Sequence, residues 1–381
     1  MRVVVIIPSF YPAIVYGGST FASYHLTKAA AESGVDLWVS TTNANGCERL
    51  DKEVNIFQSL DQFKIKYYHE ELVNYFSSSY IFGIFKDIKN ADVVHIQSIF
   101  SYPTPLALFY SMLFRKKVLL SPRGSLAQWS FQIKGWHKKQ WIKCLITPFI
   151  KTVTWHATSE KEKNDILKIF PKAHVKIISD GTFLDQSKTA LTRVDMFNSL
   201  SLKESRYIAA MGRIHPVKGY DILIKSFQII KKSNPDLKLL IAGSDEGDLK
   251  HLTELVSSFK LDNQVVFVGP VSGATKESFL QNAELLVLPS HTENFGIVVV
   301  EALAQGTPVV ASNKTPWRVL EKFNAGYWVE NTTNEIAHSI INLLSNTTTN
   351  WEMNAKLLSK EFDWYKIAKR YKHILEEIHN G

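Results

Sequence analysis

The sequence has few of the features that mark secreted, disulfide-bonded or membrane-spanning chains. Only two cysteines occur among 381 residues, Cys47 and Cys144, and their spacing fits neither a disulfide framework nor a metal site. No apolar run reaches the roughly 18 residues that a membrane span needs. The segment Met1–Phe10 has no cleavage-site pattern, so it is predicted to be a first strand and not a signal peptide. These absences favour a cytoplasmic protein.

Acidic residues are missing from one long stretch. The formal net charge is +8, and no Asp or Glu occurs between Asp92 and Glu160. Basic residues and tryptophans fill the gap, namely Arg115, Lys116, Lys117, Arg123, Lys134, Lys138, Lys139, Lys143 and Lys151 with Trp129, Trp136, Trp141 and Trp155 in or beside it. A basic patch of this kind suits an anionic partner.

Short apolar runs alternate with helix-like segments through both halves of the chain, which predicts α/β architecture. Expected strands begin at Val3, Asp36, Ile65, Asp92, Lys117, Thr152 and Val175, and then at Tyr207, Lys238, Val265, Leu285, Pro308 and Gly326. This alternation of strand-like and helix-like segments stops between Asp180 and about Ser205. We therefore expect two Rossmann-like, doubly wound domains facing a cleft, with bounds 1–185 and 186–360. Residues 361–381 are expected to form a helix that packs on the first domain.

The turn after the first strand lacks the G-x-G-x-x-G spacing of a dinucleotide fingerprint. It does contain Gly17 and Gly18 just before a helix start, where backbone can approach a phosphate. An ordinary flexible turn explains the two glycines equally well.

The loop Gly212–Gly219, GRIHPVKG, follows an expected strand and opens a helix. Arg213 and Lys218 could place two cations over one point, which suits a diphosphate leaving group. Two solvated surface cations are the alternative.

The segment His291–Gly306, HTENFGIVVVEALAQG, lies between two expected strands. It predicts a turn at Asn294–Gly296 and a helix from Ile297 that stops at Gly306. Glu293 precedes this helix and Glu301 lies within it. The N-terminus of this helix offers free N–H groups to an anion, with Glu293 beside these groups and Glu301 behind them.

These motifs, together with FVGPVSG (Phe267–Gly273), resemble the retaining glycosyltransferases of family 4, which have the GT-B fold. The similarity is to enzymes of the polysaccharide and O-antigen type. It implies transfer of a hexose-type sugar from a nucleotide sugar with retained anomeric configuration. It also implies that no metal and no other cofactor is bound.

The resemblance implies a role for each matching residue. Arg213 and Lys218 would hold the donor diphosphate, Glu301 the ribose hydroxyls, and Glu293 the donor sugar. Backbone N–H groups of Phe295, Gly296 and Ile297 would lie near phosphate and sugar. Glycines 17 and 18 would approach the diphosphate from the first domain, and the base pocket would be lined by Gly243, Val268 and Val271. Glu293, Arg213, Lys218 and Arg123 form the expected catalytic set.

One stretch departs from the family. Many relatives have His-Gly after the fifth strand of the first domain, but here Ser121-Pro122-Arg123-Gly124 stands in its place. Arginine cannot act as a base, so we expect Arg123 to contact the acceptor or the diphosphate. A phosphate oxygen is then expected to take the acceptor's proton. His95 is a second acceptor candidate, and a satisfied core histidine is the alternative for it.

The basic segment 134–151 suits an anionic membrane surface through Lys134, Trp136, Lys138, Lys139, Trp141 and Lys143. A helix packed in the first domain with solvated lysines is the alternative. Nucleic acid is not expected, because no binding motif accompanies the patch. Membrane contact would fit peripheral association at the inner face of the membrane and a lipid-linked saccharide acceptor, in surface polysaccharide or lipopolysaccharide assembly.

Several alternatives stay open at this point. The donor could be UDP- or GDP-linked, and the acceptor could be soluble. A non-catalytic module that binds a nucleotide sugar is a further alternative on the same fold.

Overall fold

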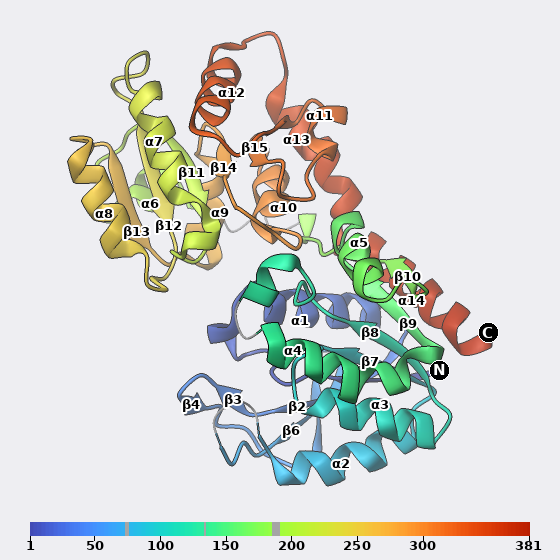
Figure 1. Cartoon of the computed structure of the whole chain (residues 1–381). Helices are drawn as coiled ribbons and strands as arrows, with labels where there is room; N and C mark the ends of the chain where they lie inside the picture. Colours follow the sequence, from blue (N-terminus) through green and yellow to red (C-terminus); the bar gives the residue numbers. More distant parts are fainter. Residues whose placement is uncertain (73–75, 133–134, 185–190) are drawn as a thin grey trace. The chain divides into compact units, whose positions relative to one another are not determined.

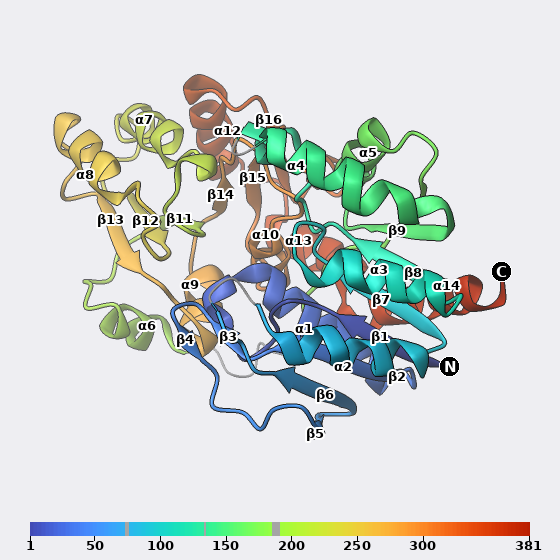
Figure 2. The same cartoon turned by 60° about the horizontal axis from the view of Figure 1, so that its bottom comes forward.

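The computed structural model describes residues 1–72, 76–132, 135–184 and 191–381 (Figures 1 and 2). The chain divides into two compact units. Unit 1 contains Met1–Gly181 and Trp364–Gly381, and unit 2 contains Thr182–Asp363. Each unit holds one twisted sheet with helices packed on it.

The sheet of unit 1 has the strand order β10-β9-β8-β7-β1-β2-β6-β5, and only β5 runs antiparallel to its neighbour. The chain moves outward from β1 through β2 to β6 and then returns to the other side of β1, so the strand order reverses between β1 and β7. The strands are β1 (Arg2–Ile6), β2 (Asp36–Thr42), β5 (Phe57–Leu60), β6 (Phe63–Tyr68), β7 (Val93–Gln97), β8 (Lys117–Ser121), β9 (Val153–Ala157) and β10 (His174–Ile177). A separate small hairpin joins β3 (Ala44–Asn45) and β4 (Glu48–Arg49).

Helices cover both faces of this sheet. On one face α2 and α3 pack together, and on the other α1 packs against α14 (Figure 1). The helices of unit 1 are α1 (Gly18–Glu32), α2 (Ser78–Lys89), α3 (Pro103–Leu113), α4 (Gly135–Trp141), α5 (Glu160–Ile169) and α14 (Trp364–Asn380). Parallel strands buried on both faces read as continuous apolar runs, which is why they could be located in the sequence.

The C-terminal helix α14 is held to unit 1 along its length. Its buried residues recur every three or four positions, as expected for one face of a helix. Lys372 Nζ donates to the carbonyl of Ser33 at 3.0 Å, and Glu377 pairs with Lys176 at 2.7 Å. The last helix of the chain therefore belongs to the same body as the first strand.

Helix α4 does not continue regularly. A π turn covers Ile142–Ile146, and a 3-10 turn covers Thr147–Thr152. Pro148 lies at the start of that 3-10 turn, where it has no N–H to donate. Ile142 and Ile146 are buried, whereas Leu145 is 39% exposed, so only the two isoleucines pack into the core of unit 1.

Unit 2 has the strand order β13-β12-β11-β14-β15-β16, all parallel. The strands are β11 (Tyr207–Met211), β12 (Lys238–Ala242), β13 (Val265–Gly269), β14 (Leu286–Leu288), β15 (Val309–Ser312) and β16 (Gly326–Val329). The strand order reverses between β11 and β14. Ligands in open parallel sheets bind beyond the carboxyl ends of the strands at such a reversal.

Two apolar cores lie on the two faces of the unit 2 sheet. One includes side chains from α6, α9, α10 and α13, and the other includes side chains from α7, α8 and α12. The helices are α6 (Arg193–Ser199), α7 (Tyr220–Ile230), α8 (Leu249–Ser258), α9 (Gly273–Gln281), α10 (Ile297–Ala304), α11 (Val319–Lys322), α12 (Thr333–Ser345) and α13 (Trp351–Ser359). Across the described ranges of both units, no helix combines the length and apolar character that crossing a membrane requires.

Candidate functional site

The two loops at the strand reversal of unit 2 contact each other directly. The backbone N–H of His291 donates to the carbonyl of Val217 at 2.9 Å. Gly219 has φ of 67°, and a Cβ there would lie 2.2 Å from the carbonyl oxygen of Pro289. Glycine is therefore required where the loop after β11 crosses the loop after β14.

Lys218 and Glu293 meet at this crossing. Lys218 Nζ lies 2.7 Å from Glu293 Oε2, and the two side chains are 15% and 17% exposed. Ser290 Oγ donates to the same oxygen at 3.3 Å. The carboxylate is thus neutralised at the edge of the core, beyond the end of β14, and can be reached by a ligand.

Tyr220 supports this pair from the side of the core. Its hydroxyl donates to the carbonyl of Gly212 at 3.2 Å. Burial raises the pKa of Tyr220, and the nearby charge of Glu293 raises that pKa further. The phenol therefore stays protonated and acts as a fixed donor to the loop 212–219.

Arg213 has a different partner from Lys218. Its Nη1 lies 2.7 Å from Glu246 Oε2 in the loop after β12, and these side chains are 56% and 38% exposed. The sequence suggested that Arg213 and Lys218 lie over one point. In the structure each cation engages its own carboxylate, one exposed and one half-buried.

Helix α10 begins as expected, at Ile297, with Gly296 as a left-handed N-terminal cap residue of φ 83°. No side chain caps this helix start. The ring of Phe295 is buried among Trp317 and Phe362, and its carbonyl accepts a hydrogen bond from Trp317 Nε1 at 2.5 Å. The indole thereby fixes the turn that orients the first N–H groups of the helix.

Glu301 lies in the second turn of α10. Its Oε1 pairs with Lys276 Nζ of α9 at 2.8 Å, and the Glu301 side chain is 19% exposed. Its neighbours Val300 and Ala302 are buried. Glu301 is therefore not a freely solvated carboxylate on an exposed helix face.

The remaining expected donor residues lie at the carboxyl ends of β12 and β13, with Gly243 just after β12, Val268 in β13 and Val271 just after β13. A Cβ on Gly243 would lie 1.8 Å from the carbonyl oxygen of Gly212, so the close approach of the two strand ends requires glycine. Val268 and Val271 are half-buried and pack against the core of unit 2. The sequence reasoning missed Glu246, Lys276 and Ser290. Glu246 and Ser290 lie in the loops that follow β12 and β14 and could have been found by that position, whereas nothing local marks Lys276.

In unit 1, Gly17 precedes α1 with φ of 76°, and a Cβ there would meet nothing within 4 Å. Gly18 is the first residue of that helix, which has no side-chain cap. The backbone is therefore open at this turn, as an approaching ligand would require.

Arg123 is held inside unit 1. Its Nη1 pairs with Asp180 Oδ1 at 2.7 Å, and its Nε donates to Gln97 Oε1 at 3.2 Å. The Arg123 and Asp180 side chains are 9% and 11% exposed. Arg123 has φ of 55°, which is uncommon for a residue other than glycine. The guanidinium thus links the last residue of β7 to the segments that follow β8 and β10. A ligand that contacted Arg123 would therefore have to share the guanidinium with a buried ion pair.

His95 is fully buried and both ring nitrogens have partners. Nδ1 lies 2.7 Å from the hydroxyl of Tyr371, and Nε2 lies 2.7 Å from Ser121 Oγ. Ser121 Oγ continues to His156 Nδ1 at 2.6 Å, and His156 Nε2 lies 2.8 Å from the carbonyl oxygen of Ile178. This placement leaves no part of the His95 ring to an acceptor, so the acceptor assignment is wrong and the core-histidine interpretation describes it. Burial lowers the pKa of both histidines, to about 3 for His156.

The basic segment divides into exposed and structural side chains. Lys134 lies outside the described residues. Lys138 Nζ donates to the carbonyl of Ser130 at 2.6 Å, and Trp141 Nε1 donates to the carbonyl of Ile99 at 2.9 Å. Trp136 is 68% exposed, and Lys139 and Lys143 are exposed as well. Only these three described members of the predicted membrane set face solvent freely enough to meet a surface.

No three His, Cys, Asp or Glu side chains within the described ranges gather in a way that could hold a metal ion. The expectation of a reaction without a bound metal stays a prediction.

Comparison with known proteins links this geometry to a family. Residues 192–359 match the family model described as Glycosyl transferases group 1. An uncharacterized glycosyltransferase of Haemophilus influenzae is 30% identical over 183 residues, which are 47% of this chain and 51% of that protein. The chain thus spans about half the length of the curated relative that it matches.

Solved structures match over nearly the whole chain. Anabaena Alr3699/HepE in complex with UDP superposes with a TM-score of 0.78 and 17% identity, covering 99% of this chain and 100% of that one. WaaG, a glycosyltransferase involved in lipopolysaccharide biosynthesis, gives 0.71 and 16%, covering 98% and 99%. At these identities the likeness concerns the fold. The chain therefore has the GT-B fold, and its residues 192–359 match the group 1 glycosyl transferases.

Proposed function

We propose that the protein is a retaining glycosyltransferase of family 4 that moves a hexose-type sugar from a nucleotide sugar to a lipid-linked saccharide. The observation that carries this proposal is the Lys218–Glu293 pair. It lies at the strand reversal of unit 2, within the segment that matches the group 1 family. The reaction would serve surface polysaccharide or lipopolysaccharide assembly, with the protein at the inner face of the membrane.

Donor binding would use groups that already surround this point. Lys218, Arg213 and the N-terminal N–H groups of α10 can neutralise a diphosphate, the task that a metal ion performs in many phosphate sites. Glu301, held by Lys276, can accept hydrogen bonds from the two ribose hydroxyls. The reaction would then proceed without a bound metal.

The transfer itself balances without an added acid or base. The bond between the sugar's anomeric carbon and the diphosphate oxygen breaks, and the electron pair leaves with the nucleoside diphosphate. The acceptor hydroxyl attacks on the same face, and its proton passes to a phosphate oxygen. Glu293 would hold the sugar hydroxyls, because its pairing with Lys218 lowers its nucleophilicity.

Two solved structures support parts of this proposal. Alr3699/HepE was solved with UDP, which favours a uridine nucleotide over a guanosine nucleotide for this chain. WaaG takes part in lipopolysaccharide biosynthesis, which favours an acceptor of that class. Each of these names describes the other protein.

A membrane role is supported by an exposed face of unit 1. Helices α2 and α3 pack side by side (Figure 2). Large apolar side chains of these two helices and of the π turn are exposed to solvent. This apolar face consists of Phe82, Phe85, Phe109, Met112, Leu113 and Leu145. The same helices, the π turn and the segments that follow them also carry basic residues, namely Lys86, Lys89, Arg115, Lys116, Lys117, Lys143 and Lys151. Apolar and basic side chains together suit an anionic lipid surface.

Thermal unfolding with UDP, GDP, ADP and their hexose derivatives tests the proposal. We expect UDP or GDP to raise the unfolding temperature, since a ligand that binds the folded state stabilises it. Release of nucleoside diphosphate with a lipid-linked acceptor, but not with a soluble one, would support the lipid-linked assignment. If no nucleoside diphosphate stabilises the protein, the proposal fails. If a nucleotide sugar binds but is never consumed, the non-catalytic alternative holds.

A further inference from the structure

A pocket in unit 1 lies outside the donor site, and its lining includes Lys139 and Lys143 of the predicted membrane set. It has a volume of about 520 Å³ and lies between the π turn and α5. We propose that this pocket binds the hydrocarbon chain of an anionic membrane lipid, with Lys139 at the lipid's acidic group. The inference rests on the proposed function in one respect only, namely whether that lipid is the acceptor or a component of the membrane.

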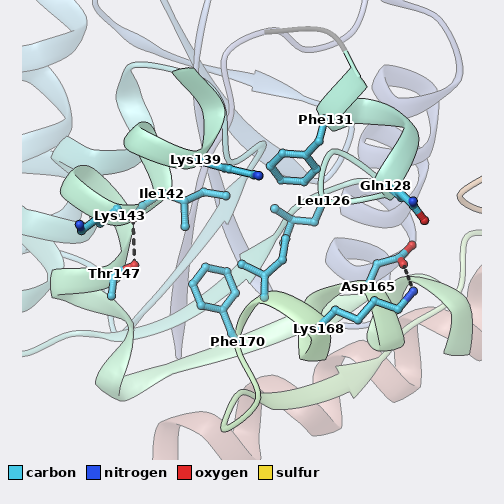
Figure 3. Close-up of a pocket in the computed structure, with 11 residues that line it drawn as sticks. Leu126, Gln128, Phe131, Lys139, Ile142, Lys143, Thr147, Asp165, Lys168 and Phe170 are labelled. Carbon is cyan, nitrogen blue, oxygen red and sulfur yellow. Dashed lines mark hydrogen bonds and ion pairs between the residues drawn. The ribbon is translucent and has the colours of Figure 1, made fainter. Parts of the chain in front are cut away.

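The interior of the pocket is apolar. Figure 3 shows the rings of Phe131 and Phe170 on two sides, with Leu126 and Ile142 between them. Ile169 completes the apolar lining. Pockets of roughly 300–1,000 Å³ with apolar walls and few polar groups are the usual size and make-up of small-molecule sites. The walls of this pocket offer an alkyl or prenyl chain an apolar environment.

The charges around the pocket select for an anion. The ammonium group of Lys139 points toward the Phe131 ring (Figure 3). Within the described ranges, Lys139 has no carboxylate within ion-pair distance. Asp165 is the one acidic residue of the lining, and its two oxygens pair with Lys168 at 3.1 Å and with Lys161 at 3.9 Å. The carboxylate is thus neutralised, whereas the charge of Lys139 is left for a ligand.

The pocket and the apolar face of unit 1 share the π turn. Ile142 lines the pocket, and Leu145, three residues later, belongs to the exposed apolar face. A π turn inserts an extra residue into a helix and changes the direction of the side chains that follow it. One turn of the chain therefore places Ile142 in the pocket and Leu145 on the apolar face, so a lipid that contacts the apolar face would lie near the pocket.

The direct test is calorimetric titration of the full-length protein with decyl phosphate below its micelle concentration. Decyl glucoside supplies the same chain without charge, and inorganic phosphate supplies the charge without the chain. We expect saturable one-to-one binding of decyl phosphate that is clearly tighter than binding of the other two. No saturable binding of decyl phosphate, or equal binding of decyl glucoside, would overturn the proposal.

Variants locate the binding. Lys139→Gln should weaken binding about tenfold, as expected for loss of one charge-assisted hydrogen bond. Lys172→Gln is the matched control, because Lys172 is exposed, follows Phe170 by two residues and does not line the pocket. Ile169→Trp should fill the pocket and abolish binding, with thermal unfolding to show that this variant folds. Equal affinity in Lys139→Gln and Lys172→Gln would contradict the assignment.

A second measurement identifies the source of the ligand. Vesicles containing phosphatidylglycerol with a photoreactive acyl chain should label residues 126–147 or 165–170 of the wild type and not of Ile169→Trp. Labelling elsewhere only, or labelling by a free fatty acid alone, would reject a membrane lipid as the occupant. Both experiments omit nucleotide sugar. A negative result here therefore does not bear on the proposed donor site, and a negative transfer assay does not bear on lipid binding in the pocket.

Discussion

Lys218 Nζ lies 2.7 Å from Glu293 Oε2, at the place where the strand order of unit 2 reverses. Lys218 comes from the loop after β11 and Glu293 from the loop after β14, 75 residues later in the chain. The two opposite charges face each other in a half-buried position. A diphosphate on the lysine and sugar hydroxyls on the glutamate would therefore meet groups already in place.

Glu301 gives the first prediction. If it binds the ribose, Glu301→Ala should weaken binding of UDP by about tenfold, the size of two neutral hydrogen bonds or one charged one. It should weaken binding of 2′-deoxy-UDP less, because that ligand has already lost one of the two hydroxyls. Calorimetry with both ligands makes the comparison. A Glu301→Ala variant that loses the same factor for both would show that the carboxylate acts through Lys276 and not on the ribose.

Arg123 gives a prediction about stability. Its ion pair with Asp180 is buried, so removing one partner leaves an uncompensated charge. Arg123→Ala should destabilise the protein by about 3–5 kcal/mol. Urea unfolding measures this change, and Lys168→Ala, whose side chain is 70% exposed, serves as the control with an expected effect below about 1 kcal/mol.

If Arg123→Ala unfolds at the wild-type urea concentration, the ion pair is not structural. The acceptor or diphosphate role expected from the sequence would then account for this residue better.

The two buried histidines predict a dependence of stability on pH. Burial, and next the charge of Arg123, lowers the pKa of His156 to about 3, below its ordinary value of 6.5. The unfolded chain therefore takes up a proton that the folded chain refuses. The stability is fully present above about pH 6.5 and is lost as the pH falls toward 3, by about 1.4 kcal/mol per pH unit for one such group.

Urea unfolding at pH 7.5 and pH 5.0 measures this loss. In His156→Asn the amide keeps a polar side chain that does not titrate, so the difference between the two pH values should shrink by about 2 kcal/mol. An unchanged difference would mean that other groups cause the acid sensitivity.

Much of the fold could be predicted from apolar runs and from the positions of glycines in the sequence. The parallel strands of both units were expected near their observed places, because strands buried on both faces are continuous apolar segments. Helix α10 was expected from Ile297 to Gly306 and forms Ile297–Ala304. The strand β5 and the hairpin of β3 and β4 were missed, since these short, half-exposed strands have no such run.

The side-chain pairs could not be predicted. Arg213 meets Glu246 and Glu301 meets Lys276, and these partners are 33 and 25 residues apart in sequence. Which charged side chains meet depends on how neighbouring loops fold over the strand ends, which local patterns do not encode. For the same reason, the sequence could not decide whether His95 contacts an acceptor or is a core histidine. Its partner Tyr371 comes from the last helix of the chain.

The apolar face of unit 1 predicts binding to anionic vesicles. The double change Phe109→Ser and Leu113→Ser should reduce flotation with phosphatidylglycerol vesicles by about tenfold, since both side chains are exposed and would enter the lipid. Met353→Ser is the control, because Met353 is an exposed apolar residue of unit 2. Failure of the wild type to float would end the membrane assignment, and so would equal flotation of the variants.

The most direct test of the central claim is sugar transfer by Lys218→Ala. The rate of nucleoside diphosphate release should be measured with the donor that stabilises the wild type. Loss of the cation should lower kcat/KM by about a hundredfold or more, because this charge would stabilise the departing diphosphate. Lys225→Ala, on the exposed side of α7, should transfer sugar normally. Transfer by Lys218→Ala at the wild-type rate would contradict the account of the donor site.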